Sequence, residues 1–358
     1  MLSQEQVTDA LRMVVDPELK RDIVSLGFVK EIGIDGGAVT LKLEFSSQAS
    51  FVLDELKEQC TKIIGALPGV ERLTVEMNSN EQQGGQNPIN LIPGVKNVIA
   101  IASGKGGVGK STTAVNLAMA LKQTGAKVGI LDADIYGPSL PRMMNVLNPP
   151  RFEQEKGKKV DPLEQYGVSI MSMGFFMPED TPMIWRGPMV GMAVEQLLRD
   201  IEWGELDYLV IDLPPGTGDA QLTLTQKVPI NGVVIVSTPQ DVALADVRKG
   251  VNMFKKVEAP VLGIIENMSY YVCPDCGHRA EIFNHGGAEK EAANTGMEFL
   301  GHVPISEDIR QDADAGKPIV VARPDSPQAK QYMAIAKKVA EKLAASEKKS
   351  KFPKIVVQ

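Results

Sequence analysis

The sequence is short of several features that mark particular protein classes. Its 358 residues contain three cysteines, too few for the disulfide framework of a secreted protein. No apolar run approaches the roughly 18 residues that a membrane-spanning helix needs, and Met1–Leu11 lacks the basic and apolar blocks of a signal peptide. A net charge of -7 argues against broad attraction to nucleic acid or anionic lipid. We therefore expect a cytoplasmic protein without nucleic-acid or membrane partners.

What the chain does contain is typical of a globular protein. Apolar residues make up 43% of the sequence and charged residues 23%, which predicts a substantial core. A chain of this length accommodates one domain of roughly 250 residues and a smaller one of about 80 to 100. The sequence pattern divides in the same way.

Residues 1–77 predict a small α/β domain. The expected elements are a helix opened by a Ser3–Gln6 capping box, a hairpin of Val29–Ile34 with Ala38–Phe45, a helix over Phe51–Gly65 and a strand over Arg72–Met77. Cys60 lies on the apolar face of the second helix, where a free cysteine behaves as a small hydrophobe, so we expect it in the core. Residues 78–96, rich in Asn, Gln and Gly, read as a flexible linker.

Residues 97–345 predict a larger α/β domain. Near-continuous apolar runs recur between helical stretches, at Val98–Ser103, Val128–Asp132, Val168–Met173, Tyr208–Leu213, Gly232–Ser237, Val261–Glu266 and Phe299–Val303. Such runs indicate a mainly parallel sheet flanked by helices on both faces. A last helix is expected at about Gln328–Ala344, followed by a basic, frayed tail over residues 346–358.

One motif predicts phosphate binding. The pattern G-x-x-x-x-G-K-[ST] is matched by Gly104, Lys105, Gly106, Gly107, Val108, Gly109, Lys110 and Ser111. The match follows a predicted strand and opens a predicted helix, the context in which backbone N–H groups and the helix N-terminus hold phosphates. We expect the nucleotide site to extend to Thr112, with Lys110 on the terminal phosphates and Ser111 on Mg²⁺.

Carboxylates at two strand ends complete the predicted nucleotide site. Asp212 suits the task of holding Mg²⁺, and Asp134 that of orienting the attacking water, although an Asp at a strand end is often only a helix cap. Pro214-Pro215-Gly216 would then sense the third phosphate. Asn267 follows another strand, and its amide suits the adenine edge; a turn-forming Asn is the alternative.

The pair Cys273 and Cys276 permits several interpretations. With His278 and His285 it could make a zinc site, and a redox dithiol or a buried structural pair are further alternatives. If two chains meet about a twofold axis, their pairs sum to four thiolates, the complement that holds a [4Fe–4S] cluster.

Taken together, the motifs resemble the Mrp/ApbC family of iron–sulfur cluster carrier ATPases over about Asn97–Leu343. The segments that carry the resemblance are Ser103–Ser111, Asp132–Ser139, Trp185–Met189, Asp212–Asp219 and Cys273–Cys276. The resemblance implies a homodimer that binds ATP, Mg²⁺ and a bridging [4Fe–4S] cluster and transfers the cluster to apoproteins. It also places the chain in the deviant P-loop subclass, in which Lys105 contacts nucleotide across the dimer interface.

The N-terminal domain carries a shorter resemblance of its own. Asp16–Leu19 and Leu26–Val29 look like the small iron–sulfur assembly domain often fused ahead of this ATPase. That domain usually has a cysteine after its second hairpin strand, where this chain has Phe45–Ser50, so direct cluster ligation here is not implied. Two other functions remain alternatives at this point: a partition or septum-type positioning ATPase, and a nucleotide-regulated zinc-binding protein.

Overall fold

The computed structural model describes residues 2–15, 21–45, 50–79, 91–147, 149, 159–176, 187–216, 218, 221–222, 224–225 and 228–350. The chain forms two compact units, Met1–Pro88 and Ile89–Gln358, each with a core of its own. Most of the segment predicted as a linker, residues 80–90, lies outside the described residues. No described helix is both long enough and apolar enough to cross a bilayer.

The smaller unit is a three-stranded sheet covered by two helices. Strand β1 (Val29–Asp35) pairs antiparallel with β2 (Ala38–Phe45), and β3 (Arg72–Ser79) runs parallel to β2. Helix α1 (Gln4–Leu11) begins with the predicted capping box, and α2 (Ser50–Gly65) supplies Cys60 to the core. Burial of Cys60 confirms that prediction and raises the pKa of its thiol to about 11.

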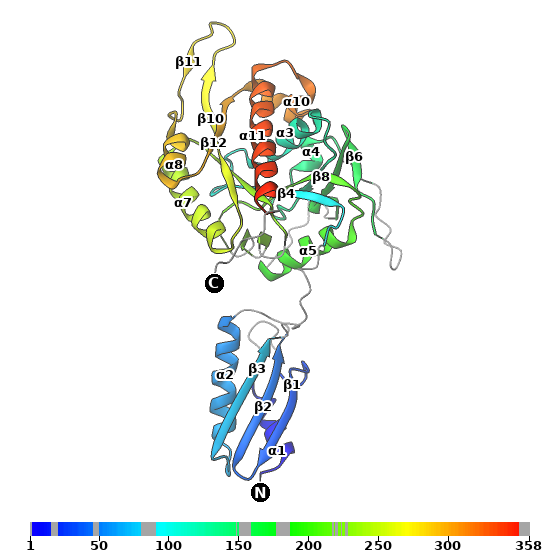
Figure 1. Ribbon diagram of the computed structural model, residues 1–358, viewed down its shortest axis with the longest axis vertical. Coiled ribbons are helices and arrows are strands. Elements are labelled where there is room, and N and C mark those ends of the chain that lie inside the picture. The colour runs from blue at the N-terminus through cyan, green and yellow to red at the C-terminus, as the bar shows by residue number, and fades with distance from the viewer. Residues whose placement is uncertain are drawn as a thin grey trace. The chain divides into compact units, whose positions relative to one another are not determined.

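The larger unit is built on one mixed, mostly parallel sheet, as predicted (Figure 1). Its strands lie in the order β11-β10-β9-β4-β8-β5-β7-β6, with β12 also paired to β10. The strands are β4 (Val95–Ala102), β5 (Val128–Asp132), β6 (Leu163–Gln165), β7 (Val168–Ser172), β8 (Leu206–Asp212), β9 (Gly232–Ser237), β10 (Val261–Val272), β11 (Arg279–Ala280) and β12 (Phe299–Ile305). Pairing is antiparallel for β10 with β11 and for β6 with β7.

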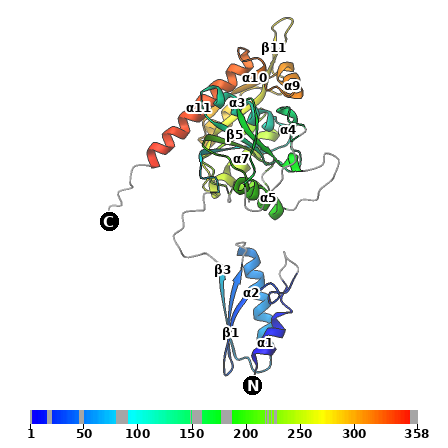
Figure 2. The ribbon, with the colours of Figure 1, turned by 90° about the vertical axis from the view of Figure 1, so that its right-hand side faces the viewer.

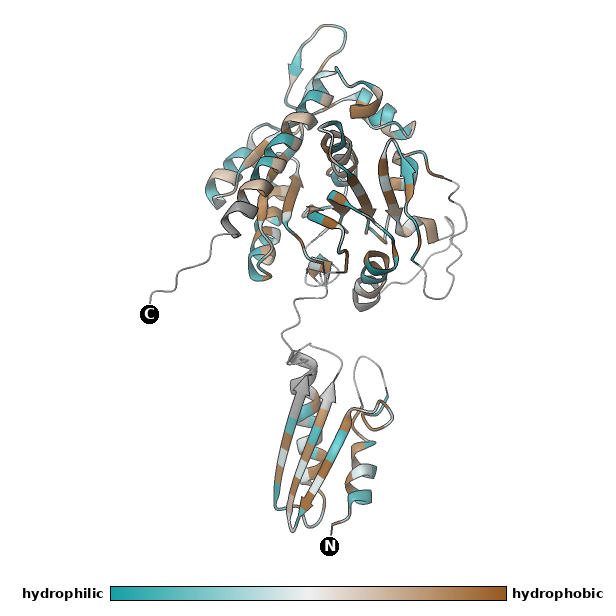
Figure 3. Ribbon diagram, turned by 45° about the vertical axis from the view of Figure 1, so that its right-hand side comes forward, coloured by the Kyte–Doolittle hydropathy of each residue, from teal (hydrophilic) through white to brown (hydrophobic). Residues whose placement is uncertain are grey.

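Helices cover both faces of this sheet, which explains why its central strands are apolar throughout (Figures 2 and 3). One core cluster joins the sheet to α5 (Gly187–Asp200), α7 (Asp241–Lys256) and α8 (Gly287–Thr295). The other joins it to α3 (Lys110–Gln123), α4 (Leu140–Met143), α10 (Ile319–Ala322) and α11 (Pro327–Ser350). The short elements η1 (Met173–Phe176) and α9 (Glu307–Asp314) lie in connections.

Three features differ from the sequence prediction. Strand β10 continues six residues past Glu266, because its second half pairs with β11 and with β12. The sequence did not indicate this, since β11 is too short to show an apolar pattern and β12 is distant in the chain. The short strands β6 and β11 were not predicted. Helix α11 extends to Ser350 rather than ending at Ala344, so the first residues of the predicted tail are helical. Ala, Glu and Lys there are good helix formers, which explains the extension.

Candidate functional site

The phosphate-binding motif forms a loop between β4 and α3 at the centre of the sheet. Gly107 and Gly109 have φ values of 79° and 83°, a region that strongly favours glycine. Gly104 is needed for a different reason, since a Cβ there would lie 2.7 Å from the Cβ of Asp246. The Ser103 hydroxyl donates to the Lys105 carbonyl at 2.8 Å and holds the start of the loop. The predicted P-loop therefore has the backbone shape that its glycines imply.

Lys110 gathers the predicted catalytic residues around its ammonium group. The side chain is 6% exposed, and Nζ lies 2.5 Å from Asp212 Oδ1, 3.5 Å from Asp134 Oδ2 and 3.3 Å from Ser111 Oγ. These residues come from α3, from the end of β8 and from the loop after β5. Parallel strands end at the same edge of a sheet, which is why residues 102 positions apart meet here.

The two carboxylates keep oxygens that fit a magnesium ion, in the case of Asp212, and a water molecule, in the case of Asp134. Asp212 Oδ2 and Asp134 Oδ1 are buried, and neither has a hydrogen-bond partner among the described residues. Burial raises the pKa of Asp212, and the neighbouring Lys110 opposes that rise. Hard oxygen ligands beside a P-loop hydroxyl are what Mg²⁺ requires. Ser111, Asp212 and Asp134 therefore suit the roles predicted for them.

Asp132 has a role that the sequence did not show. Its buried carboxylate accepts hydrogen bonds from the backbone of Asp134, Ser139 and Leu140 and from the Ser172 hydroxyl, at 3.0 to 3.1 Å. Burial, together with the nearby Asp212, raises its pKa to about 7. Asp132 thus anchors the loop that presents Asp134 and caps the start of α4. The alternative that an Asp at a strand end caps a helix therefore applies to Asp132 and not to Asp134.

Lys105 and Asn267 join the P-loop to neighbouring elements. Lys105 Nζ pairs with Asp246 Oδ2 on α7 at 3.7 Å, and the side chain remains 38% exposed. Asn267 is buried, and its Nδ2 donates to the Val108 carbonyl at 2.8 Å. Asn267 therefore supports the P-loop backbone directly, a contact that the sequence did not predict.

The cysteine pair lies in the turn between β10 and β11, on a hairpin that projects from the sheet (Figure 1). The Cys273 N–H donates to the His278 carbonyl and the Gly277 N–H to the Cys273 carbonyl, both at 2.9 Å. Cys276 is exposed, which contradicts the alternative of a buried structural pair. Backbone N–H groups of Cys276 and Asp275 lower the pKa of the Cys273 thiol and favour the thiolate that binds metal.

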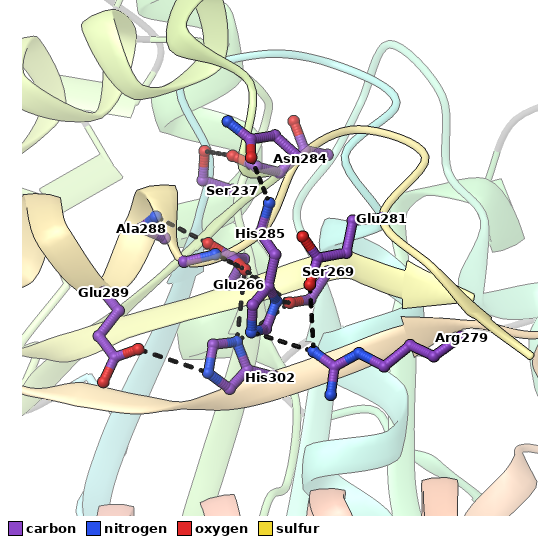
Figure 4. Close-up of polar contacts among 12 residues, drawn as sticks. Ser237, Glu266, Ser269, Arg279, Glu281, Asn284, His285, Ala288, Glu289 and His302 are labelled. Atoms are coloured by element: carbon purple, nitrogen blue, oxygen red, sulfur yellow. Dashed lines mark hydrogen bonds and ion pairs between the residues drawn. The ribbon is translucent and has the colours of Figure 1, made fainter. Parts of the chain in front are cut away.

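His285, considered above as a zinc ligand, is engaged elsewhere. Its Nδ1 lies 2.7 Å from Ser269 Oγ and its Nε2 lies 3.1 Å from Arg279 Nη2 (Figure 4). With Glu266 and His302 it forms a group whose ligand atoms all lie within 4.8 Å of one another, the spacing of a possible metal site. Neither cysteine belongs to that group.

Comparison with known proteins identifies the family of each unit. The family model described as NUBPL iron-transfer P-loop NTPase matches residues 94–340, and one described as iron-sulfur cluster assembly protein matches residues 4–77. The chain belongs to the NUBPL iron-transfer P-loop NTPase family. The Mrp/ApbC resemblance and the predicted α/β fold are both confirmed.

Members of this family with curated names are similar over nearly the whole chain. An iron-sulfur cluster carrier protein of Synechocystis is 46% identical over 96% of this chain and 99% of its own length. One from Escherichia coli is 44% identical over 96% and 94%, respectively. An iron-sulfur cluster transfer protein NUBPL of Dictyostelium discoideum is 54% identical over 74% of this chain and 84% of its own length.

Solved structures extend the comparison to the fold. A nucleotide-binding protein of Archaeoglobus fulgidus in complex with ADP is 36% identical, with a TM-score of 0.59 over 69% of this chain and 97% of that one. The cell division ATPase MinD of Pyrococcus furiosus is 21% identical, with a TM-score of 0.52 over 68% and 98%. The second likeness shows a shared P-loop NTPase fold.

Proposed function

We propose that this chain is an ATP-dependent carrier that binds an iron–sulfur cluster at Cys273 and Cys276 and transfers it to apoproteins. The observation that carries the proposal is the pair of thiols, Cys276 exposed and Cys273 partly exposed, on a hairpin of the same unit that holds the P-loop. Membership of the iron-transfer family and the names of its relatives support it. They do not favour the positioning ATPase.

The ligand count favours a homodimer. One chain offers two thiols in the hairpin, whereas a [4Fe–4S] cluster is commonly held by four. The remaining cysteine, Cys60, is buried in the other unit and its raised pKa opposes the thiolate form. A twofold axis beside the hairpin would bring two pairs together without any further residue type. The cluster is then cargo shared by two chains.

The P-loop residues supply the chemistry of ATP hydrolysis. Bound Mg²⁺ would neutralise phosphate charge, held by the Ser111 hydroxyl and, directly or through water, by Asp212. Lys110 would bind the terminal phosphates, and Asp134 would orient water through its free oxygen. Gly104 to Thr112 would surround the phosphates with N–H groups. Lys105 would reach nucleotide bound to the partner chain, and Asn267 would contact the adenine in addition to Val108.

The smaller unit has a separate role in this proposal. Its match to the iron-sulfur cluster assembly model covers residues 4–77, yet its cysteine is in the core. The segment where a ligand cysteine is expected, residues 46–49, lies outside the described residues and contains none in the sequence. We therefore assign cluster ligation to the hairpin alone.

Anaerobic reconstitution with iron and sulfide tests the proposal. The parent should acquire visible absorption and about four irons per dimer, both of which Cys273→Ala with Cys276→Ala should abolish. Cys60→Ala is the matched control, because it removes a thiol from the core and should leave the iron content unchanged. A parent that binds zinc in the hairpin and no cluster would refute the carrier and support a regulated zinc protein.

A further inference from the structure

The Ser269 hydroxyl lies at the centre of a polar cluster with Glu266, His285 and His302 (Figure 4). Its Oγ is 2.6 Å from Glu266 Oε1, 2.7 Å from His285 Nδ1 and 3.0 Å from His302 Nδ1. Ser269 and Glu266 are fully buried, and the two imidazoles are about one quarter exposed. Four residues from three segments therefore meet at one oxygen atom.

The Ser269 hydroxyl can bond to all three of these neighbours at once. A hydroxyl has one donor and two acceptor sites. Ser269 donates to the Glu266 carboxylate, so both histidines donate to it through Nδ1–H. His285 is then left with Nε2 as an acceptor, and Arg279 Nη2 donates to it at 3.1 Å. His302 Nδ1 also lies 3.3 Å from Glu266 Oε1, and its Nε2 lies 3.6 Å from Glu289 Oε2.

The same hydrogen bonds disfavour a metal ion among Glu266, His285 and His302. The Ser269 hydroxyl lies between their ligand atoms, and the Glu266 carboxylate also accepts the N–H groups of Gly286 and Ala288, at 2.9 and 2.7 Å. Burial alone would raise the pKa of Glu266, but the bonds from Ser269, Ala288 and Gly286 outweigh it and lower the pKa. Both carboxylate oxygens therefore already accept hydrogen bonds from protein donors.

Strand β10 connects this cluster to the P-loop. Asn267, two residues before Ser269, donates to the Val108 carbonyl and packs so closely on Gly109 that no side chain fits there. Met268, between them, has a φ of 56°, which is rare for a residue other than glycine. The pairing with β12 is irregular from Asn267 to Tyr271. One residue with an unfavourable φ therefore separates the P-loop contact of Asn267 from Ser269.

Arg279 connects the cluster to the cysteine hairpin. It pairs with Val272, the residue before Cys273, and follows His278, whose carbonyl holds the Cys273 N–H. Its guanidinium carbon lies 4.2 Å from the centre of the Tyr270 ring. Movement of His285 would pull on the base of the turn that carries both thiols.

A second set of contacts leads from the P-loop to the same cluster. Lys105 pairs with Asp246 on α7, and two residues later Arg248 forms two 2.7 Å bonds with Glu291 of α8. The first residues of α8 and the loop before it are the ones held by Glu266. Both routes end at the side chains bonded to Ser269.

We propose that Ser269, His285 and Arg279 are positioning residues that transmit the nucleotide state of the P-loop to the cysteine hairpin. This deepens the proposed function, because it gives ATP a way to change how the hairpin holds its cargo. Coupling of this kind needs contacts that differ between the two states, and the strained segment around Met268 is where such a difference can arise.

Thiol reactivity in the cluster-free protein tests the proposal. Cys273 and Cys276 are alkylated with iodoacetamide, with and without a non-hydrolysable ATP analogue and Mg²⁺, and the rates are read by peptide mass spectrometry. In the parent, nucleotide should change the rate at least about fivefold, the lower end of ordinary allosteric coupling. Buried Cys60 is the internal reference for the folded smaller unit, and nucleotide binding is the reference for the larger one.

Two variants cut the path at different points. Ser269→Ala removes the central hydroxyl, and Arg279→Ala, at an exposed position that does not endanger folding, removes the last link. In both, the ratio of rates with and without nucleotide should fall to about one while nucleotide binding persists. Glu281→Gln is the matched control, since Glu281 lies 3.8 Å from Arg279 but contacts no other member of the path among the described residues, and should keep the parental ratio.

Two results would overturn the proposal: no effect of nucleotide on the parent thiols, or a parental ratio retained in both variants. Neither depends on cluster binding. Failure to assemble a cluster would instead overturn the carrier function while the thiol measurement still decides the coupling.

Discussion

Lys105 Nζ lies 3.7 Å from Asp246 Oδ2, so the lysine that marks the deviant P-loop subclass is paired within its own chain. Asp246 also receives a 3.0 Å bond from Lys249, which with Lys105 lowers the pKa of its carboxyl. If Lys105 acts on nucleotide in a partner chain, it has to exchange this carboxylate for phosphate. Because the ion pair is exposed, breaking it costs little free energy.

The first prediction separates the lysine from its carboxylate. Lys105→Ala should lower ATP hydrolysis by about 10³-fold, the scale of a cation supplied in trans to a phosphoryl transfer. Asp246→Asn should keep the rate within about fivefold of the parent, because an exposed ion pair contributes at most about 1 kcal/mol. Steady-state phosphate release measures both, and Lys249→Ala is the control for the other partner. An equal loss in the Lys105 and Asp246 variants would show that the ion pair itself is the functional unit.

The second prediction concerns the independence of the two sites. Ser111→Ala should abolish Mg²⁺-dependent ATP hydrolysis and leave cluster loading intact, because the hairpin uses none of the P-loop side chains. Cys273→Ala with Cys276→Ala should do the reverse. Phosphate release and iron content, measured on the same preparations, give the comparison. Loss of both activities in a folded Ser111 variant would refute the separation. Lys110→Ala is less suitable, since it leaves Asp212 and Asp134 buried without their counter-ion.

The third prediction tests the anchoring role of Asp132. Asp132→Asn replaces an accepting oxygen by an amide that faces N–H and hydroxyl donors, and should destabilise the larger unit by about 1–3 kcal/mol. Asp314→Asn makes the same change at an exposed i,i+4 pair with Arg310 and should lower stability by less than about 1 kcal/mol. Urea unfolding measures both. Similar unfolding midpoints for the two variants would argue against the anchor.

The fourth prediction follows from the raised pKa of Cys60, about 11. At pH 8 the folded apoprotein should show two thiols that react with a disulfide reagent, and the third only after denaturation. Because the folded pKa lies above the unfolded value near 9, the unfolded chain loses its proton first as pH rises. The smaller unit should therefore lose stability between about pH 9 and 11, and Cys60→Ala should make that loss smaller. Three reactive thiols at pH 8 in folded protein would contradict the burial.

Much of the structure could be predicted from the sequence, because the patterns that indicate it involve residues close together in the chain. The glycines of Gly104–Gly109 report a backbone shape, and the apolar runs report strands covered on both faces, as the structure shows for β5 and β9. The Ser3–Gln6 capping box and the hairpin around Gly36 are likewise local, and both formed as predicted. The burial of Cys60 could be predicted because it lies on the apolar face of a helix.

The tertiary structure decided what depends on residues far apart in sequence. Asp132 and Asp134 look equivalent in the chain, but one bonds to the loop around it and the other faces Lys110 with a free oxygen. Asn267 contacts Val108, which is far away in the sequence. His285 bonds to Ser269 and not to the cysteines. No motif or residue spacing predicts either contact. Residue types in a motif determine which chemistry is available. Packing determines which partner each polar group meets, because a buried donor or acceptor left without a partner costs free energy.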